Sequence, residues 1–232
     1  MADIYLIRHG KTVGNMEKRY VGRTDEPLCE AGIREINGRR ELLLRSFSMT
    51  GDHCERLDDK GSGVETRFVD PLMPRKVYVS PMLRCRQTAE ILFPDARQEV
   101  ITEFREMDFG QFEYKNYEEL VGNRDYQAFI DSGGKIDFPD AEPQLQFRDR
   151  VQKAFQKCLW EAENVLSELK SGEPQDPLVF VVHGGTIMAI MEAYARPHRD
   201  YFDWQVSAAR GYRCVVKYEK DGFYLSDVTR IL

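Results

Sequence analysis

Two of the four histidines in this chain share the same local setting. Each follows a short apolar run that favours a β-strand, and each is followed by a glycine. They are His9, before Gly10, and His183, before Gly184. Ligands of open α/β sheets bind beyond the carboxyl ends of the strands, and glycine lets the backbone approach them closely. If the two strands are neighbours, both imidazoles face one crevice.

Two arginines join this pair of histidines. Arg8 immediately precedes His9, and Arg84 lies one helical turn beyond Ser80, where another predicted strand ends. Guanidinium groups bind phosphate oxygens well, and the free N–H groups of a helix that begins at Gly184 favour an anion. Two guanidinium groups and two imidazoles around a glycine-lined crevice therefore suit a phosphate group.

Other chemistries fit the sequence less well. Neither zinc-site spacing, His-x-His or His-Glu-x-x-His, occurs, and two arginines beside the histidines would repel a metal ion. The segment Gly10-Lys11-Thr12 is similar to the end of a P-loop, but Tyr5 stands where that motif needs glycine. The serine-nucleophile motif G-x-S-x-G does not occur either. We therefore expect neither a metal nor another cofactor.

Five short motifs occur in order along the chain: LIRHGKT at 6–12, VGRTDEPL at 21–28, SPMLRCRQTA at 80–89, EFREMDFG at 103–110 and HGG at 183–185. Together they resemble the signature of the histidine phosphatase superfamily, in its phosphoglycerate mutase-like branch. Each motif alone is weak, whereas the ordered set is specific. The resemblance implies phosphoryl transfer at a histidine.

The resemblance also implies roles for the charged residues. His9 would be the nucleophile that forms a phosphohistidine, its neutral ring fixed by a hydrogen bond from one nitrogen to a backbone carbonyl. Arg8, Arg84 and His183 would stabilise the charge on the phosphoryl oxygens.

The remaining site residues follow from the same motifs. Glu106, in preference to Glu103 and Glu113, would protonate the leaving group and then take a proton from the hydrolytic water. Three further residues are expected to bind the phosphate: Asn15, Gly22 and Gly184.

Within the superfamily, the motifs favour a phosphatase over a mutase. Met107 follows Glu106, where glycolytic mutases usually carry a basic residue. The motifs resemble those of α-ribazole phosphatase-like and general phosphatases, although Tyr114 replaces the glycine of their aromatic-Glu-Gly ending. We predict a metal-independent phosphomonoesterase for a small phosphorylated metabolite. A phosphoglycerate mutase and an inactive phosphate-binding relative are the alternatives.

The site must be positioned by strands that alternate with helices. The hydrophobic pattern predicts strands at 4–7, 76–79, 99–102, 178–182, 213–218 and 223–228. It predicts helices at 27–44, 81–93, 114–130, 145–169 and 184–194, with Ser80 capping the second of them. This alternation predicts a three-layer α/β sandwich with a mostly parallel central sheet and an antiparallel edge strand. A helical excursion at 103–145 would cover the carboxyl ends of the strands.

Charge and organisation narrow the possible partners. With 33 Lys and Arg against 39 Asp and Glu, the net charge of −6 disfavours nucleic acids and anionic membranes. The five cysteines are scattered without a C-x-x-C pair, and no signal segment is recognisable, so we expect a cytoplasmic protein. We expect a single domain over 1–232, with a long loop insert at 46–75 and a hairpin near 61–63. Its expected partner is a small phosphate ester.

Overall fold

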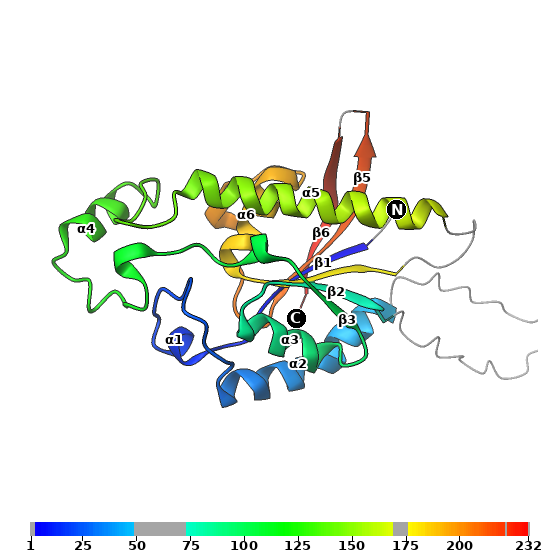
Figure 1. Cartoon of the computed structure of the whole chain (residues 1–232), viewed down its shortest axis with the longest axis horizontal. Coiled ribbons are helices and arrows are strands. Elements are labelled where there is room, and N and C mark those ends of the chain that lie inside the picture. The colour runs from blue at the N-terminus through cyan, green and yellow to red at the C-terminus, as the bar shows by residue number, and fades with distance from the viewer. Residues whose placement is uncertain (1–2, 49–72, 169–175, 221, 232) are drawn as a thin grey trace, which may run out of the picture.

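The computed structural model describes residues 3–48, 73–168, 176–220 and 222–231. In these residues six strands form one sheet in the order β3-β2-β4-β1-β5-β6 (Figure 1). They are β1 (Asp3–Arg8), β2 (Lys76–Val79), β3 (Arg97–Val100), β4 (Leu178–Val182), β5 (Gly211–Glu219) and β6 (Gly222–Ile231). The first four are mutually parallel, and β5 is antiparallel to both of its neighbours. The predicted sheet is confirmed.

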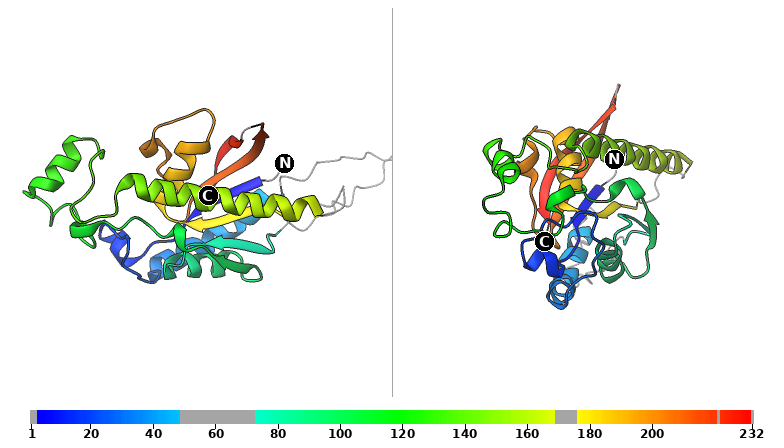
Figure 2. Two further views of the ribbon diagram at one scale, coloured as in Figure 1. Left: turned by 45° about the horizontal axis from the view of Figure 1, so that its top comes forward. Right: turned by 60° about the vertical axis from the view of Figure 1, so that its left-hand side comes forward.

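Helices cover both faces of this sheet. In Figure 1, α2 (Glu30–Ser48) and α3 (Leu83–Leu92) lie below it, and α5 (Gln144–Glu168) and α6 (Gly184–Tyr194) lie above it. The turned views of Figure 2 keep this arrangement. Neighbouring residues of β1 enter opposite layers, because side chains alternate along a strand: Leu6 packs in the α5 and α6 core, and Ile7 in the α2 and α3 core. The predicted three-layer sandwich is confirmed.

The sheet order places the two histidine-bearing strand ends side by side. β4 is buried along its whole length and pairs with β1 on one side and with β2 on the other. Arg8 is in register with Val182, and the N–H of His9 donates to the carbonyl of Val182 at 2.9 Å. His9 and His183 therefore follow the carboxyl ends of neighbouring parallel strands, at the same level in the sheet.

The excursion at 103–145 contains less helix than the sequence pattern predicts. Its regular elements are η1 (Thr102–Phe104), η2 (Gly110–Phe112) and α4 (Arg124–Asp131), which lies at the far end of the molecule in Figure 1. The prediction of a helix over 114–130 was wrong for its first part. Tyr114 has φ of 61° and Gly122 has φ of 81°, so the backbone turns at both places. Asn123 then caps α4 by accepting the N–H of Tyr126 at 3.0 Å.

Several predicted boundaries also need correction. The helix predicted from residue 81 begins at Leu83 with Met82 as its N-cap, and the hydroxyl of Ser80 contacts His183 at 2.7 Å and accepts the N–H of Met82 at 3.4 Å. The helix predicted over 27–44 is α2, which begins later and continues to Ser48, into the segment predicted as loop. The third strand lies at Arg97–Val100 rather than 99–102.

The long insert and the domain organisation stay predictions. Most of the insert at 46–75, including the hairpin predicted near 61–63, lies outside the described residues. One sheet shared by all six strands supports our proposal of a single domain. The short helices α1 (Val13–Met16) and η3 (Tyr201–Trp204) complete the described elements. Among the described helices, none combines the length and the apolar character that a bilayer span requires.

Candidate active site

The imidazoles of His9 and His183 meet at the carboxyl ends of β1 and β4. Their ring centroids are 5.1 Å apart and their planes make an angle of 68°. Both rings are buried, with 4% of His9 and 0% of His183 exposed. The predicted convergence of the two histidines is therefore present in the fold.

The ring of His9 is fixed by a backbone carbonyl, as the sequence predicts. Its Nδ1 lies 2.7 Å from the carbonyl oxygen of Gly10, so Nδ1 carries the proton and Nε2 keeps its lone pair. Burial lowers the pKa of His9 well below its ordinary value, and the nearby Arg84 and Arg8 lower it further. At neutral pH His9 is an uncharged imidazole, which is the form that can act as a nucleophile.

The ring of His183 is held from the neighbouring strand. The hydroxyl oxygen of Ser80, at the end of β2, lies 2.7 Å from Nε2 of His183. The sulfur of Cys85 approaches the same nitrogen to 3.5 Å. Burial, followed by the charge of Arg84, lowers the pKa of His183 well below its ordinary value. His183 is thus a second neutral imidazole whose orientation the protein fixes.

Arg84 is fully buried and is held by a loop rather than by its own helix. Its Nη1 donates to the carbonyl of Thr24 at 2.7 Å, and its Nη2 donates to the carbonyls of Val21 and Gly22 at 3.3 and 2.9 Å. The buried Nε has no hydrogen-bond partner within the described part of the chain. An unpaired buried N–H is costly, so this nitrogen is suited to an external acceptor.

Arg8 has the same arrangement. Its Nη1 donates to the carbonyl of Val206 at 2.7 Å, while its buried Nε lacks a partner among the described residues. Beside it, Gly184 begins α6 so closely that a Cβ there would lie 3.4 Å from Cζ of Arg8. Two guanidinium groups and a helix N-terminus thus surround the histidines, which is a setting for an oxyanion.

Glu106 supplies a carboxyl group next to these cations. One oxygen accepts the N–H of Met107 at 3.1 Å, and the other accepts the N–H of Gly185, in the first turn of α6, at 3.0 Å. Burial raises the pKa of Glu106, against the opposing effect of these hydrogen bonds and of Arg84 and Arg8. A carboxyl group in this setting is able to hold and release a proton.

The backbone around Glu106 is clamped by an ion pair. Arg150, on α5, donates to the carbonyls of Glu103, Arg105 and Glu106. It also makes two hydrogen bonds of 2.6 Å to the carboxylate of Glu142. This bidentate pair holds the loop that carries Glu106.

The structure separates the three glutamates that the sequence compares. Glu103 is exposed at the surface, and Glu113 accepts hydrogen bonds from Gly22 and Thr24. Of these three glutamates, Glu106 is the one that binds the second histidine motif, by accepting the N–H of Gly185.

The three further phosphate-binding residues differ in their surroundings. Asn15 accepts the N–H of Thr12 at 3.2 Å, in a capping box whose N-cap is Thr12, while Gly22 donates its N–H to Glu113 at 3.0 Å. Gly184 lies against Arg8. For Asn15 and Gly22 the structure shows contacts within the protein, and a phosphate contact stays a prediction.

Comparison with known proteins identifies the family. A family model described as the histidine phosphatase superfamily (branch 1) matches residues 4–50 and 63–230. The chain belongs to this superfamily. Its curated relatives include a probable phosphoglycerate mutase, GpmB, of Proteus mirabilis, which is 27% identical over 163 residues. That match covers 68% of this chain and 64% of the relative, so the chain spans just under two thirds of that protein.

Solved structures share the fold of this histidine phosphatase superfamily member. The α-ribazole phosphatase of Shigella flexneri superimposes with a TM-score of 0.68 at 21% identity, covering 96% of this chain and 94% of that one. A mycobacterial glucosyl-3-phosphoglycerate phosphatase, solved with VO3, superimposes with a TM-score of 0.69 at 19% identity, covering 97% and 96%. At these identities the likeness establishes the architecture.

Some residues of this superfamily member's site were not singled out by the sequence reasoning. Thr88 accepts the N–H of Gly10 at 3.0 Å and donates to the carbonyl of Arg84 at 2.7 Å, so it joins the motif at 6–12 to the motif at 80–89. Ser80 was predicted as a helix cap, not as the partner of His183. Both residues lie in the motif at 80–89, and this was the feature of the sequence that could have identified them as site residues. Among the described residues, no cluster of three or more His, Cys, Asp or Glu forms a potential metal site.

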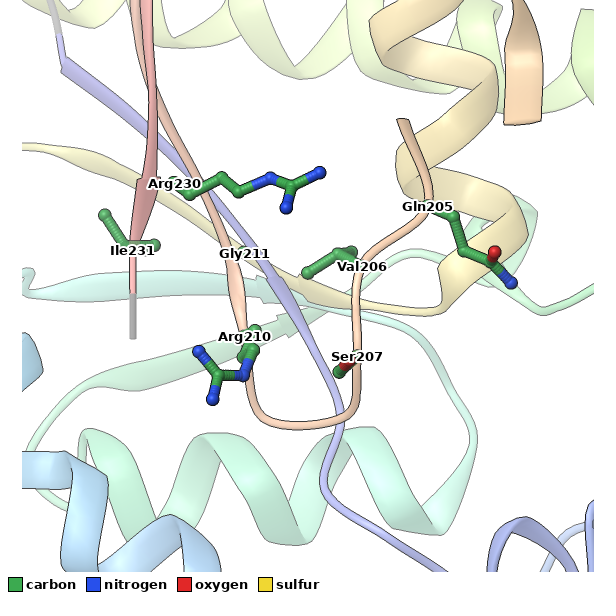
Figure 3. A pocket seen from close by; sticks show the side chains of 7 residues that line it. All are labelled: Gln205, Val206, Ser207, Arg210, Gly211, Arg230 and Ile231. Atoms are coloured by element: carbon green, nitrogen blue, oxygen red, sulfur yellow. The ribbon is translucent and has the colours of Figure 1, made fainter. Parts of the chain in front are cut away.

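A separate cavity of about 280 Å³ lies beside the ends of β5 and β6 (Figure 3). Its walls are Gln205, Val206, Ser207, Arg210, Gly211, Arg230 and Ile231. It contains neither histidine, but its wall residue Val206 supplies the carbonyl that holds Arg8. The cavity therefore lies next to the residue that holds Arg8, and the two imidazoles do not line it.

Proposed function

We propose that this protein is a metal-independent phosphomonoesterase that hydrolyses a small phosphorylated metabolite through a phosphohistidine intermediate. One arrangement carries the proposal. A neutral His9 with its Nε2 lone pair available is buried beside two guanidinium groups, each with a buried Nε that lacks a partner within the described residues. Such a site binds an oxyanion and presents a nucleophile to it.

In the first half-reaction the phosphoryl group is transferred to His9. Nε2 attacks phosphorus, while Arg8, Arg84 and His183 stabilise the charge on the phosphoryl oxygens. The bond from phosphorus to the ester oxygen breaks, and Glu106 donates its proton to the departing alkoxide. Burial raises the pKa of Glu106, which favours the protonated form that this step requires.

In the second half-reaction water replaces the histidine on phosphorus. Glu106, now a carboxylate, takes a proton from the attacking water, and the bond from phosphorus to Nε2 breaks. Inorganic phosphate leaves and Glu106 is protonated again. Asn15, Gly22 and Gly184 are the proposed additional phosphate contacts, of which Gly184 lies beside Arg8.

A phosphoglycerate mutase is the second candidate, because curated relatives carry that name. The side chain of Met107 argues against it. This side chain, directly after Glu106, packs against the α5 and α6 core and against the aromatic cluster of the excursion. The side chain at this position therefore gives the site neither a cation nor a hydrogen-bond donor for the carboxylate of a phosphoglycerate.

The direct test is turnover of p-nitrophenyl phosphate in the presence of EDTA, with trapping of the phosphoenzyme. We expect turnover and a base-stable, acid-labile phosphoryl group on the wild type, and loss of both in His9→Ala. A folded wild type without turnover of a panel of sugar phosphates, nucleotides, α-ribazole phosphate and phosphoserine would support the inactive relative. A coupled assay for phosphoglycerate interconversion tests the second candidate: interconversion would support a mutase.

A further inference from the structure

Glu113 forms a hub of hydrogen bonds on the segment of residues 21–24. Its Oε1 accepts the N–H of Gly22 at 3.0 Å, the N–H of Thr24 at 2.9 Å and the hydroxyl of Thr24 at 2.7 Å. Its Oε2 accepts the N–H of Phe109 at 3.3 Å. One carboxylate thus binds the segment 21–24 to the excursion that carries Glu106.

The same segment binds Arg84 with its carbonyl groups. All three acceptors that hold the Arg84 guanidinium are backbone oxygens, those of Val21, Gly22 and Thr24. The carbonyl of Val21 and the N–H of Gly22 belong to one peptide group. That peptide group therefore lies between a carboxylate at its N–H and a guanidinium at its carbonyl. Each charge polarises the peptide group and so strengthens its hydrogen bond to the other charge.

Residues 21–24 have little freedom to move independently of Glu113. A Cβ at Gly22 would come within 1.9 Å of the carbonyl oxygen of Met107 and within 2.9 Å of Oε2 of Glu113. The residue before Glu113, Phe112, is fully buried in the aromatic cluster with Leu120 and Phe138. The backbone next to Glu113 is therefore held by the buried ring of Phe112. The carboxylate packs against a segment in which position 22 has room only for glycine.

We propose that Glu113 is a positioning residue that acts through the backbone of 21–24 to direct the guanidinium of Arg84 at the phosphoryl group. The proposal rests on the proposed function. Glu113 makes its contacts with backbone groups and with Thr24, so it does not touch the reacting atoms. Without the carboxylate, the N–H groups of Gly22 and Thr24 lose their acceptor, the segment shifts, and the three carbonyls no longer fix Arg84.

A double-mutant cycle on kcat/KM tests this coupling. Glu113→Ala is expected to lower kcat/KM for p-nitrophenyl phosphate by about 10²-fold, the scale expected when a charge-stabilising group is misplaced by about an ångström. In an Arg84→Ala background the same change is expected to have less than about a 3-fold effect, because the residue through which it acts is gone. Glu113→Gln keeps one acceptor oxygen and is expected to restore part of the loss.

Glu119→Ala is the matched control. Glu119 lies in the same excursion and also accepts hydrogen bonds from an arginine and a backbone N–H, those of Arg19 and Asn116, but it is exposed. We expect its kcat/KM to match the wild type. Equal effects of Glu113→Ala in the two Arg84 backgrounds, or no effect in the wild-type background, would overturn the proposal.

Binding of inorganic phosphate, followed by calorimetry, separates this proposal from the proposed function. If the wild type binds phosphate without turnover, the proposed hydrolase fails, and the cycle is repeated on phosphate affinity, where the same coupling is expected. Circular dichroism establishes that each variant is folded. If Glu113→Ala does not fold, Glu113→Gln takes its place in the cycle, with a smaller loss expected in the wild-type background and none beside Arg84→Ala.

Discussion

The hydroxyl oxygen of Ser80 lies 2.7 Å from Nε2 of His183 and so joins the ends of the neighbouring strands β2 and β4. The carbonyl of Gly10 holds Nδ1 of His9 at the same distance. Each of the two imidazoles therefore has one nitrogen fixed by the protein. The orientation of both rings is determined before any substrate binds, which is the condition for preorganised catalysis.

Removing the Ser80 hydroxyl should release the ring of His183. For Ser80→Ala we expect kcat to fall by about 10- to 10²-fold, because a small misplacement of a charge-stabilising group has effects of this size. Steady-state kinetics with p-nitrophenyl phosphate measures it. Cys85→Ala is the control, since its thiol makes a weaker sulfur hydrogen bond of 3.5 Å to the same nitrogen. Equal losses of kcat in both variants would contradict a specific role for the hydroxyl.

A side chain at Gly185 should displace Glu106. The Cβ of Gly185→Ala would lie 2.3 Å from Oε1 of Glu106 and 3.2 Å from the ring of Phe147. Because the carboxyl group must move, we expect kcat to fall by about 10²-fold or more. Gly38→Ala, in α2 with open space around its Cβ, should leave kcat unchanged and raise the free energy of unfolding by about 0.5–1 kcal/mol. An unchanged kcat in Gly185→Ala would argue against Glu106 as the acid.

Arg150 holds the loop that carries Glu106, and lysine should not be able to replace it. Arg150→Lys keeps the charge, but a lysine has no planar fork with which to bind Glu142 and three carbonyls together. We expect kcat to fall by about 10-fold with little change in KM. Lys153→Ala, which removes an exposed ion pair with Asp149 on the same helix, should change neither constant. An equal fall of kcat in both variants would contradict the prediction, because it would show a general effect of changing α5 and not a specific effect of Arg150.

The buried imidazoles should make the free protein less stable as the pH falls. Burial lowers the pKa of His9 and His183 below the ordinary 6.5, whereas in the unfolded chain both titrate normally. Below pH 6.5 the unfolded state therefore binds more protons. The free energy of unfolding then falls by up to about 1.4 kcal/mol per pH unit for each ring, and the full stability is present above 6.5.

Urea unfolding between pH 7.5 and 5.5 measures this dependence. His183→Gln should reduce the slope relative to the wild type, because it removes one of the two rings whose pKa burial lowers. A wild-type stability that is constant over this range would contradict the prediction, because the two rings would then bind protons as readily in the folded protein as in the unfolded chain.

The local features of this protein follow from its sequence. The short, valine-rich apolar run at 178–182 predicts a buried strand, and α5 repeats its buried residues Phe147, Val151, Phe155 and Leu159 every fourth position. His9 and His183 are each followed by glycine, which identifies both as candidates before their partners are known. Local pattern was insufficient at 114–123, where turns with positive φ at Tyr114 and Gly122 interrupt a helical pattern.

Only the tertiary structure decided which of these features meet. The register of Arg8 with Val182 brings the imidazoles to 5.1 Å, and the backbone of residues 21–24 supplies the acceptors of Arg84 and the donors for Glu113. Strand order and backbone contacts of this kind depend on the packing of segments that are far apart in the chain. Hydrophobic periodicity records which face of each element is buried, but not which neighbour buries it.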